Sequence, residues 1–131
     1  MPEARTLVPG EATGEVLVLS QPLSFWGGID PATGDVIDVH HPQRGENVAA
    51  KILVMPGGRG SSSSSSVLAE AIRAGTAPAA ILLLEPDPIV ALGAIVAREL
   101  YGTAVPVVVG GAGGGRVSVR ATTDTALIEW A

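Results

Sequence analysis

The chain has 131 residues, with 13 acidic and 8 basic side chains, a formal net charge of −5 at pH 7, and no cysteine. This length is typical of one domain, so we predict a single domain over residues 1–131. The negative charge disfavours nucleic acid as a partner, and the missing cysteines exclude disulfides and thiolate chemistry. The apolar runs are too short to span a bilayer and residues 1–10 resemble no signal peptide, so we expect a cytoplasmic protein with no membrane partner.

The N-terminal third predicts short strands joined by a turn and a loop. Residues 13–19 and 36–39 alternate apolar and polar side chains, which is typical of strands. The run Asp-Pro-Ala-Thr-Gly at 30–34 predicts a tight turn, because proline presets φ and glycine permits a positive φ. Residues 40–47 predict a polar loop.

Two histidines and three aspartates in this third give no metal-binding pattern. The side chains of His40 and His41 would point to opposite faces of an extended chain, so they do not readily share one ion. Asp30 is explained by turn chemistry, and Asp35 and Asp38 lack the spacing of a metal-binding loop. We expect a solvated loop at the histidines and no metal on this chain.

The middle of the chain predicts alternating strands and helices. Gly75 and Gly102 are typical helix terminators, and Asp87-Pro88 is typical of a helix start. Small residues in the second helix indicate close packing against a sheet: Ala91, Gly93, Ala94 and Ala97. The predicted order is a strand at 51–55, a helix at 62–74, a strand at 79–84, a helix at 89–101 and a strand at 105–109.

The C-terminal part predicts a hairpin-like turn at 110–115 and two strands at 117–119 and 126–128. Short strand–helix–strand crossovers imply parallel pairing in the middle of the chain. The N-terminal strands would then pair among themselves or close a second sheet. The predicted fold class is therefore α/β, a mixed sheet with a central β-α-β-α-β segment in a layered β/β/α domain.

The most informative motif is Pro56-Gly57-Gly58-Arg59-Gly60, followed by six serines. It links a predicted strand to a predicted helix, so unpaired backbone N–H groups and the positive end of the helix dipole converge there. Such a turn suits an anionic ligand, and Arg59 suits a carboxylate or phosphate. Serine is also a common cap and linker residue, which leaves a purely structural role open.

A second candidate is the run Ser24-Phe25-Trp26-Gly27-Gly28. Glycines next to an aromatic residue let the backbone approach a partner closely, and exposed aromatics often anchor interfaces. We predict that this loop faces the same cleft as the Arg59 turn. The alternative is that Trp26 anchors the core.

Four runs in fixed order resemble the small subunit, or swivelling domain, of the aconitase X family. They are residues 23–34 (LSFWGGIDPATG), 41–42 (HP), 58–62 (GRGSS) and 85–97 (EPDPIVALGAIVA). The resemblance implies an aconitase-like swivelling β/β/α domain. It also implies a large subunit that carries an iron–sulfur cluster or other metal, with the active site between the two and no cofactor on this chain.

The resemblance further implies dehydration of a small carboxylate substrate. The family's catalytic base, a serine in a Gly-x-Gly-Ser turn, corresponds to Ser61, and the residues expected to bind substrate are Gly58, Arg59, Gly60 and Ser62. The unbroken serine tract departs from relatives that carry Gly or Cys within it, which leaves the secondary contacts open.

The family's substrates are cis-3-hydroxy-L-proline and mevalonate 5-phosphate, and the Phe-Trp-Gly-Gly and Gly-Arg-Gly-Ser versions favour hydroxyproline. The chain is then one half of a dehydratase and inactive alone. A non-catalytic module that holds an anion with the same turn is the alternative. Activity that appears only on mixing with a large subunit separates the two.

Overall fold

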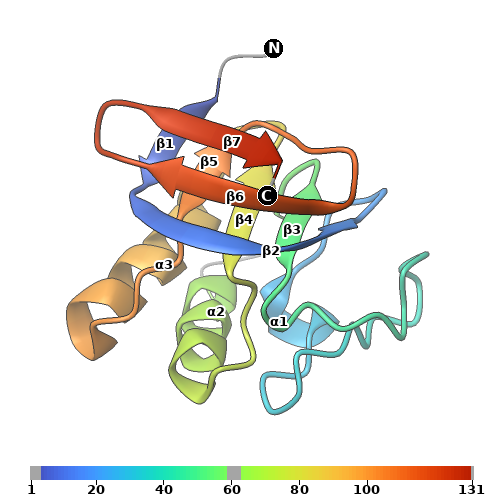
Figure 1. Cartoon of the computed structure of the whole chain (residues 1–131). Helices are drawn as coiled ribbons and strands as arrows, with labels where there is room; N and C mark the ends of the chain where they lie inside the picture. The colour runs from blue at the N-terminus through green and yellow to red at the C-terminus, as the bar shows by residue number, and fades with distance from the viewer. Residues whose placement is uncertain (1–3, 59–62, 131) are drawn as a thin grey trace.

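The computed structural model describes residues 4–58 and 63–130. Within them, seven strands form one mixed sheet in the order β1-β5-β4-β3-β2-β6-β7 (Figure 1). The strands are β1 (Arg5–Val8), β2 (Gly10–Val18), β3 (Ile52–Met55), β4 (Ala80–Leu83), β5 (Val107–Val109), β6 (Arg116–Ala121) and β7 (Ala126–Trp130). The helices are α1 (Phe25–Gly28), α2 (Ser63–Ala74) and α3 (Pro88–Tyr101).

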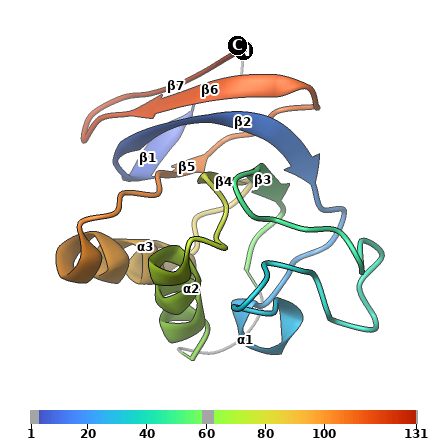
Figure 2. The ribbon, with the colours of Figure 1, turned by 60° about the horizontal axis from the view of Figure 1, so that its bottom comes forward.

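The long strand β2 turns one sheet into two layers. Its last residues, Val16 to Val18, pair in parallel with β3, whereas residues 10–15 pair antiparallel with β6. The sheet therefore curls, so that β6 and β7 lie on one side of the parallel strands and the helices on the other (Figure 2).

A core lies on each side of the parallel strands, because successive residues of a strand point to opposite faces. Leu53 and Met55 of β3 join the apolar cluster that includes the helices. Their neighbours Ile52 and Val54 join a second cluster with Val117 and other residues of β6. The predicted β/β/α layering is confirmed.

The central β-α-β-α-β segment is confirmed as β3-α2-β4-α3-β5. Strand β3 pairs in parallel with β4, and β4 with β5. Gly102 ends α3 with a φ of 71°, and Gly75 follows α2 with a φ of 80°. The Asp87 side chain caps α3 by accepting from the N–H groups of Ile89 and Val90, as Asp87-Pro88 predicts.

Close packing of α3 is partly against another helix. A Cβ added to Gly93 would lie 2.8 Å from the carbonyl oxygen of Ser65 and 3.0 Å from the Leu68 side chain, both in α2. The small residues therefore let the two helices approach as well as fitting the sheet.

Two predictions are wrong, and one strand was not predicted. Residues 36–39 form no strand; Asp35 and Val36 make only isolated bridges, to Asn47 and Ile29. Residues 110–115 do not close a hairpin, because β5 pairs with β1 and β4 whereas β6 pairs with β2 and β7. Strand β1, which was not predicted, pairs with β5 at the sheet edge rather than with β2.

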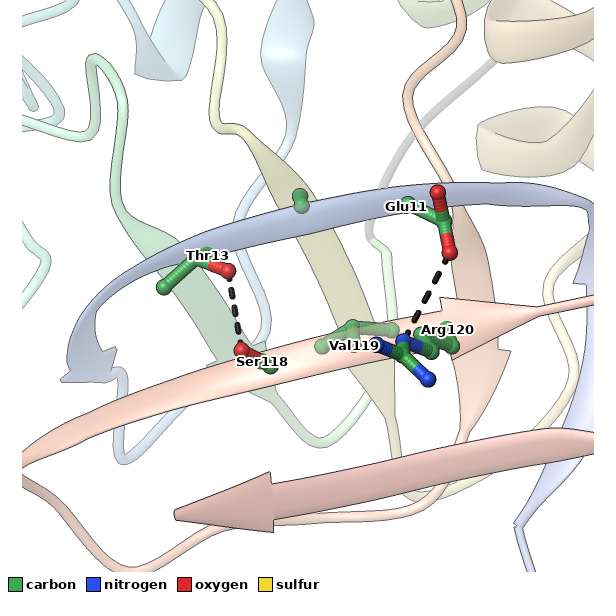
Figure 3. A pocket seen from close by; sticks show the side chains of 6 residues that line it. Glu11, Thr13, Ser118, Val119 and Arg120 are labelled. Carbon is green, nitrogen blue, oxygen red and sulfur yellow. Dashed lines mark hydrogen bonds and ion pairs between the residues drawn. The ribbon is translucent and has the colours of Figure 1, made fainter. Parts of the chain in front are cut away.

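On the outer face of the antiparallel layer, polar side chains of β2 and β6 bind one another across the two strands. Thr13 and Ser118 share a hydrogen bond of 2.9 Å, and Glu11 forms an ion pair of 3.6 Å with Arg120 (Figure 3). These pairs line a shallow hollow of about 310 Å³ on β2 and β6. Exposed cross-strand pairs of this kind contribute modestly to stability and indicate no chemistry.

Candidate functional site

The candidate site lies where parallel strands end. The carboxyl ends of β2, β3 and β4 point to the same edge of the sheet, since these strands pair in parallel. The segments that follow them are residues 19–28, 56–58 and 84–87, and α2 and α3 begin beyond the last two. Ligands of α/β sheets bind at this kind of edge.

Gly58 connects the three segments. Its N–H donates to Asp87 Oδ2 at 2.8 Å, and it forms a parallel bridge with Leu23. The other oxygen of Asp87 accepts from the N–H groups of Ile89 and Val90 at 2.9 and 3.2 Å. A Cβ on Gly58 would lie 2.3 Å from Asp87 Oδ2, so only glycine permits this approach.

The first turn of α2 is held from two sides. Ser64 is 4% exposed, and its Oγ lies 2.9 Å from Ser24 Oγ. The Trp26 N–H donates to the same oxygen at 3.4 Å. Ser65 Oγ donates to the Ile89 carbonyl oxygen at 2.8 Å, which joins α2 to α3. The serines at 64 and 65 thus have structural partners.

The Trp26 run is a tight turn rather than a regular helix. Trp26 has extended ψ, and Gly27 has a φ of 77°, which favours glycine. Trp26 is 62% exposed, so the core-anchor alternative is wrong for it. Phe25 is 1% exposed and belongs to the core cluster; its side chain is therefore not free to contact a partner, contrary to its place among the predicted interface residues.

The segments enclose little space of their own. A cavity of about 10 Å³ lies between them, which is room for about one water molecule. Its lining residues are Leu23, Phe25, Gly58, Ser64, Asp87, Ile89 and Val90. A substrate would therefore have to bind at the outer surface of this edge.

Four of the predicted site residues lie outside the described residues: Arg59, Gly60, Ser61 and Ser62. The described residues on either side, Gly58 and Ser63, lie at the candidate edge, and Ser63 begins α2. No acidic residue stands in the first turn of α2.

His41 is buried rather than solvated, which corrects the prediction for the loop. It is 5% exposed; its Nε2 donates to the Gln21 carbonyl oxygen at 3.1 Å, and its Nδ1 accepts from the Gln43 N–H at 3.0 Å. Both ring nitrogens are therefore engaged in holding the segment after β2.

Sequence reasoning assigned Asp87 to helix capping and did not find its bond to Gly58. The Asp-Pro pair is a local signal for a cap, but it carries no information about a glycine 29 residues earlier. The tight packing of Gly58 against the carboxylate is visible only in the fold.

The comparison with protein families identifies the chain. Residues 2–123 match the model described as the aconitase X swivel domain. The chain belongs to this family. Its structure matches aconitase X of Thermococcus kodakaraensis with a TM-score of 0.83 and 40% identity, covering 96% of this chain and 95% of that one.

Two kinds of curated relatives match this swivel domain. It is 58% identical over 103 residues to cis-3-hydroxy-L-proline dehydratase of Pseudomonas aeruginosa, covering 79% of this chain but only 18% of that enzyme. It is 47% identical over 95 residues to the phosphomevalonate dehydratase small subunit of Methanothermobacter thermautotrophicus, covering 72% of each chain. This chain therefore spans less than a fifth of the hydroxyproline enzyme.

The described residues present neither a membrane helix nor a metal cluster. No helix among residues 4–58 and 63–130 is long and apolar enough to cross a membrane. In the same ranges, no three His, Asp or Glu side chains gather in a way that fits a metal ion. The donor set described on this chain does not fit the metal that the family implies.

Proposed function

We propose that this chain is the small subunit of an aconitase X-type hydro-lyase and contributes Ser61, the general base, to an active site shared with a large subunit. The observation that carries the proposal is the match to the aconitase X swivel domain over residues 2–123. The edge with Gly58, the α2 N-terminus and the Trp26 turn is the part of the domain suited to this task.

The reaction requires a proton to leave the carbon next to a carboxylate and hydroxide to leave the neighbouring carbon. A serine hydroxyl is a weak base, so its anionic form must be stabilised before it takes the proton. Backbone N–H groups and the dipole at a helix N-terminus supply such stabilisation. By sequence, Ser61 precedes the described start of α2 by two residues.

The chain's own contribution to substrate binding is proposed to be Gly58, Arg59, Gly60 and Ser62. Arg59 would pair with the substrate carboxylate, because a guanidinium forms two parallel hydrogen bonds with this group. The metal or cluster belongs to the large subunit in this proposal, since the described residues offer no donor set for it.

We assign cis-3-hydroxy-L-proline as the substrate on two grounds. Identity to the Pseudomonas aeruginosa hydroxyproline enzyme is 58% over 103 residues, against 47% over 95 residues for the Methanothermobacter thermautotrophicus subunit. In addition, residues 20–28, 52–58 and 84–90 contain no Lys or Arg, so Arg59 is the one such cation that these segments and residues 59–62 offer by sequence. One arginine suits a single carboxylate better than a substrate that also carries a phosphate of about two negative charges.

The test is reconstitution with the large aconitase X subunit from the same source. We expect co-purification, and dehydration of cis-3-hydroxy-L-proline by the mixture but by neither part alone. Turnover of mevalonate 5-phosphate alone would replace the substrate assignment. A stable complex that turns over neither compound but binds carboxylates through this chain would favour the anion-binding module instead.

The Trp26 turn is proposed to contact the large subunit. The Trp26 side chain is exposed, while its backbone N–H donates to Ser64 in α2. The backbone is therefore held in place and the side chain is available to a partner. Exposed aromatic residues are among the commonest interface anchors.

A further inference from the structure

We propose that Asp87 is a positioning residue for the dehydratase site, acting through Gly58. The inference rests on the proposed function for its catalytic consequence, but the contact itself is independent of it. Asp87 stands at the start of α3, 29 residues after the glycine whose N–H it binds. Among the described residues, Gly58 is the one assigned to substrate binding that Asp87 binds.

Both oxygens of Asp87 are in use, and this requires a carboxylate. Oδ1 accepts from the N–H groups of Ile89 and Val90, while Oδ2 accepts from Gly58. Most helix caps need only one oxygen, which serine or asparagine supplies equally well. The second oxygen, Oδ2, is therefore not needed to cap α3. It accepts instead from the N–H of Gly58, the residue directly before Arg59.

The contact fixes Gly58 in position as well as in orientation. The glycine also bridges to Leu23, and a single added carbon would collide with Asp87 Oδ2 at 2.3 Å. On the far side of the segment, Ser64 is held by Ser24. Gly58, directly before Arg59, is thus held by Asp87 and Leu23, and Ser64, two residues after Ser62, is held by Ser24.

Catalytic geometry is sensitive to such an anchor, because displacement of a reacting group by about 1 Å can lower a rate about a hundredfold. Loss of a helix cap, by contrast, costs only about 1 kcal/mol of stability and leaves a folded enzyme. The two roles of Asp87 can therefore be separated by variants that keep the cap and lose the Gly58 acceptor.

The experiment compares Asp87→Ser and Asp87→Asn with the parent protein. Serine caps the helix with one short side chain that does not extend to Gly58, and asparagine has the size of aspartate but only one acceptor oxygen. Asp30→Asn is the matched control. Its Oδ1 accepts from the Ala32 N–H in a turn outside the proposed site, and asparagine retains that bond.

Three quantities are measured: hydrogen exchange of the Gly58 amide by NMR in the chain, thermal unfolding, and kcat and KM in the complex with the large subunit. We expect Gly58 exchange to accelerate about tenfold or more in Asp87→Ser and kcat to fall about tenfold or more, with a smaller change in KM. The Asp30→Asn control should match the parent protein in all three. A purely structural role would leave kcat unchanged at temperatures where the variant is folded.

Two results would overturn the inference. Unchanged protection of Gly58 in Asp87→Ser would show that the carboxylate does not hold the glycine. Faster exchange with an unchanged kcat would show that the contact does not position the site. If the parent complex has no dehydratase activity, the proposed function fails and the catalytic role of Asp87 fails with it, while Gly58 exchange still decides the contact.

A double variant sharpens the test, since Gly58→Ala and Asp87→Ser disturb the same contact. Their effects on kcat should then be far from additive, whereas independent sites add. Additive losses would count against a shared cause.

Discussion

Helices α2 and α3 begin at the same edge of the sheet, but the residues at their N-termini differ in charge. The positive end of α3 is occupied by the carboxylate of its own cap, Asp87, which binds two of the helix N–H groups. In contrast, the described part of α2 begins with four serines, Ser63 to Ser66, and none of these is acidic. A helix end that already holds a carboxylate serves the fold, whereas one without a carboxylate can stabilise an anion from outside.

The surroundings of the two helix ends differ as well. The Trp26 turn lies against the first turn of α2 through the bond from the Trp26 N–H to Ser64. Phe25, next to Trp26, and Leu68 of α2 belong to the same buried apolar cluster. If chemistry and partner contacts belong to the α2 side, changes at Ser61, Ser63 and Trp26 should alter activity or assembly more than folding.

The largest effect on stability is expected from Phe25→Ala. This change removes a fully buried aromatic side chain and leaves a cavity, so we expect a loss of about 3–5 kcal/mol in the free energy of unfolding. Denaturant unfolding of the chain measures it. A loss below about 1 kcal/mol would show that the turn is not anchored by this residue.

Ser61→Ala should abolish most of the catalysis while leaving folding and assembly intact. Loss of a general base lowers kcat by about a hundredfold or more, which corresponds to about 2.7 kcal/mol. Ser66→Ala, a change at an exposed serine of α2, is the control and should keep the parent kcat. Full activity of Ser61→Ala together with inactivity of Ser62→Ala would move the base to another serine.

Trp26→Ala separates partner binding from stability within the same turn. The exposed side chain contributes little to the isolated domain, so its unfolding should change far less than in Phe25→Ala. Affinity for the large subunit should fall by about 2 kcal/mol if Trp26 is an interface hot spot. Calorimetric titration of the large subunit measures this affinity, and an unchanged Kd would place the interface elsewhere.

Ser63→Asp would give α2 the carboxylate that α3 already has. An acidic residue in the first turn stabilises a helix by about 0.3–1 kcal/mol, so thermal stability should hold or rise slightly. The added charge should repel a carboxylate substrate and raise KM by about tenfold, since like charges a few Å apart repel by about 1–4 kcal/mol near a protein surface. Ser63→Asn adds similar bulk without charge and should leave KM close to the parent value.

The smallest effect is expected at Asp35, far in sequence from both helix ends. Hydrogen bonds from Asn47 and then Thr33 lower the pKa of Asp35 below its ordinary value. A lowered pKa in the folded state stabilises the protein above the pH where an unfolded aspartate titrates, about 4, and this contribution disappears as the pH falls through the folded pKa. The difference in unfolding midpoint between parent and Asp35→Asn should thus be steady near neutral pH and shrink below about pH 4. The Asn47→Ala background should remove most of this pH dependence.

Local patterns in the sequence predicted the parts of the fold that depend on neighbours along the chain. The apolar runs at β3 and β4, the helix ends at Gly75 and Gly102, and the cap at Asp87 were all found, because strand burial, positive φ and side-chain capping are set within a few residues. The edge that holds the candidate site followed from the alternation of strands and helices, which requires parallel pairing.

The sequence by itself therefore determined the β/β/α class, the family and the position of the Gly-Arg-Gly-Ser run between a strand and a helix. The tertiary structure decided that Phe25 is core while its neighbour Trp26 is exposed, that His41 is buried, and that Asp87 binds Gly58. Neighbouring residues in a tight turn point in different directions, and hydrogen bonds between distant segments depend on how the sheet brings its loops together. No local propensity encodes either, because both arise only when the strands have paired and their carboxyl ends share one edge.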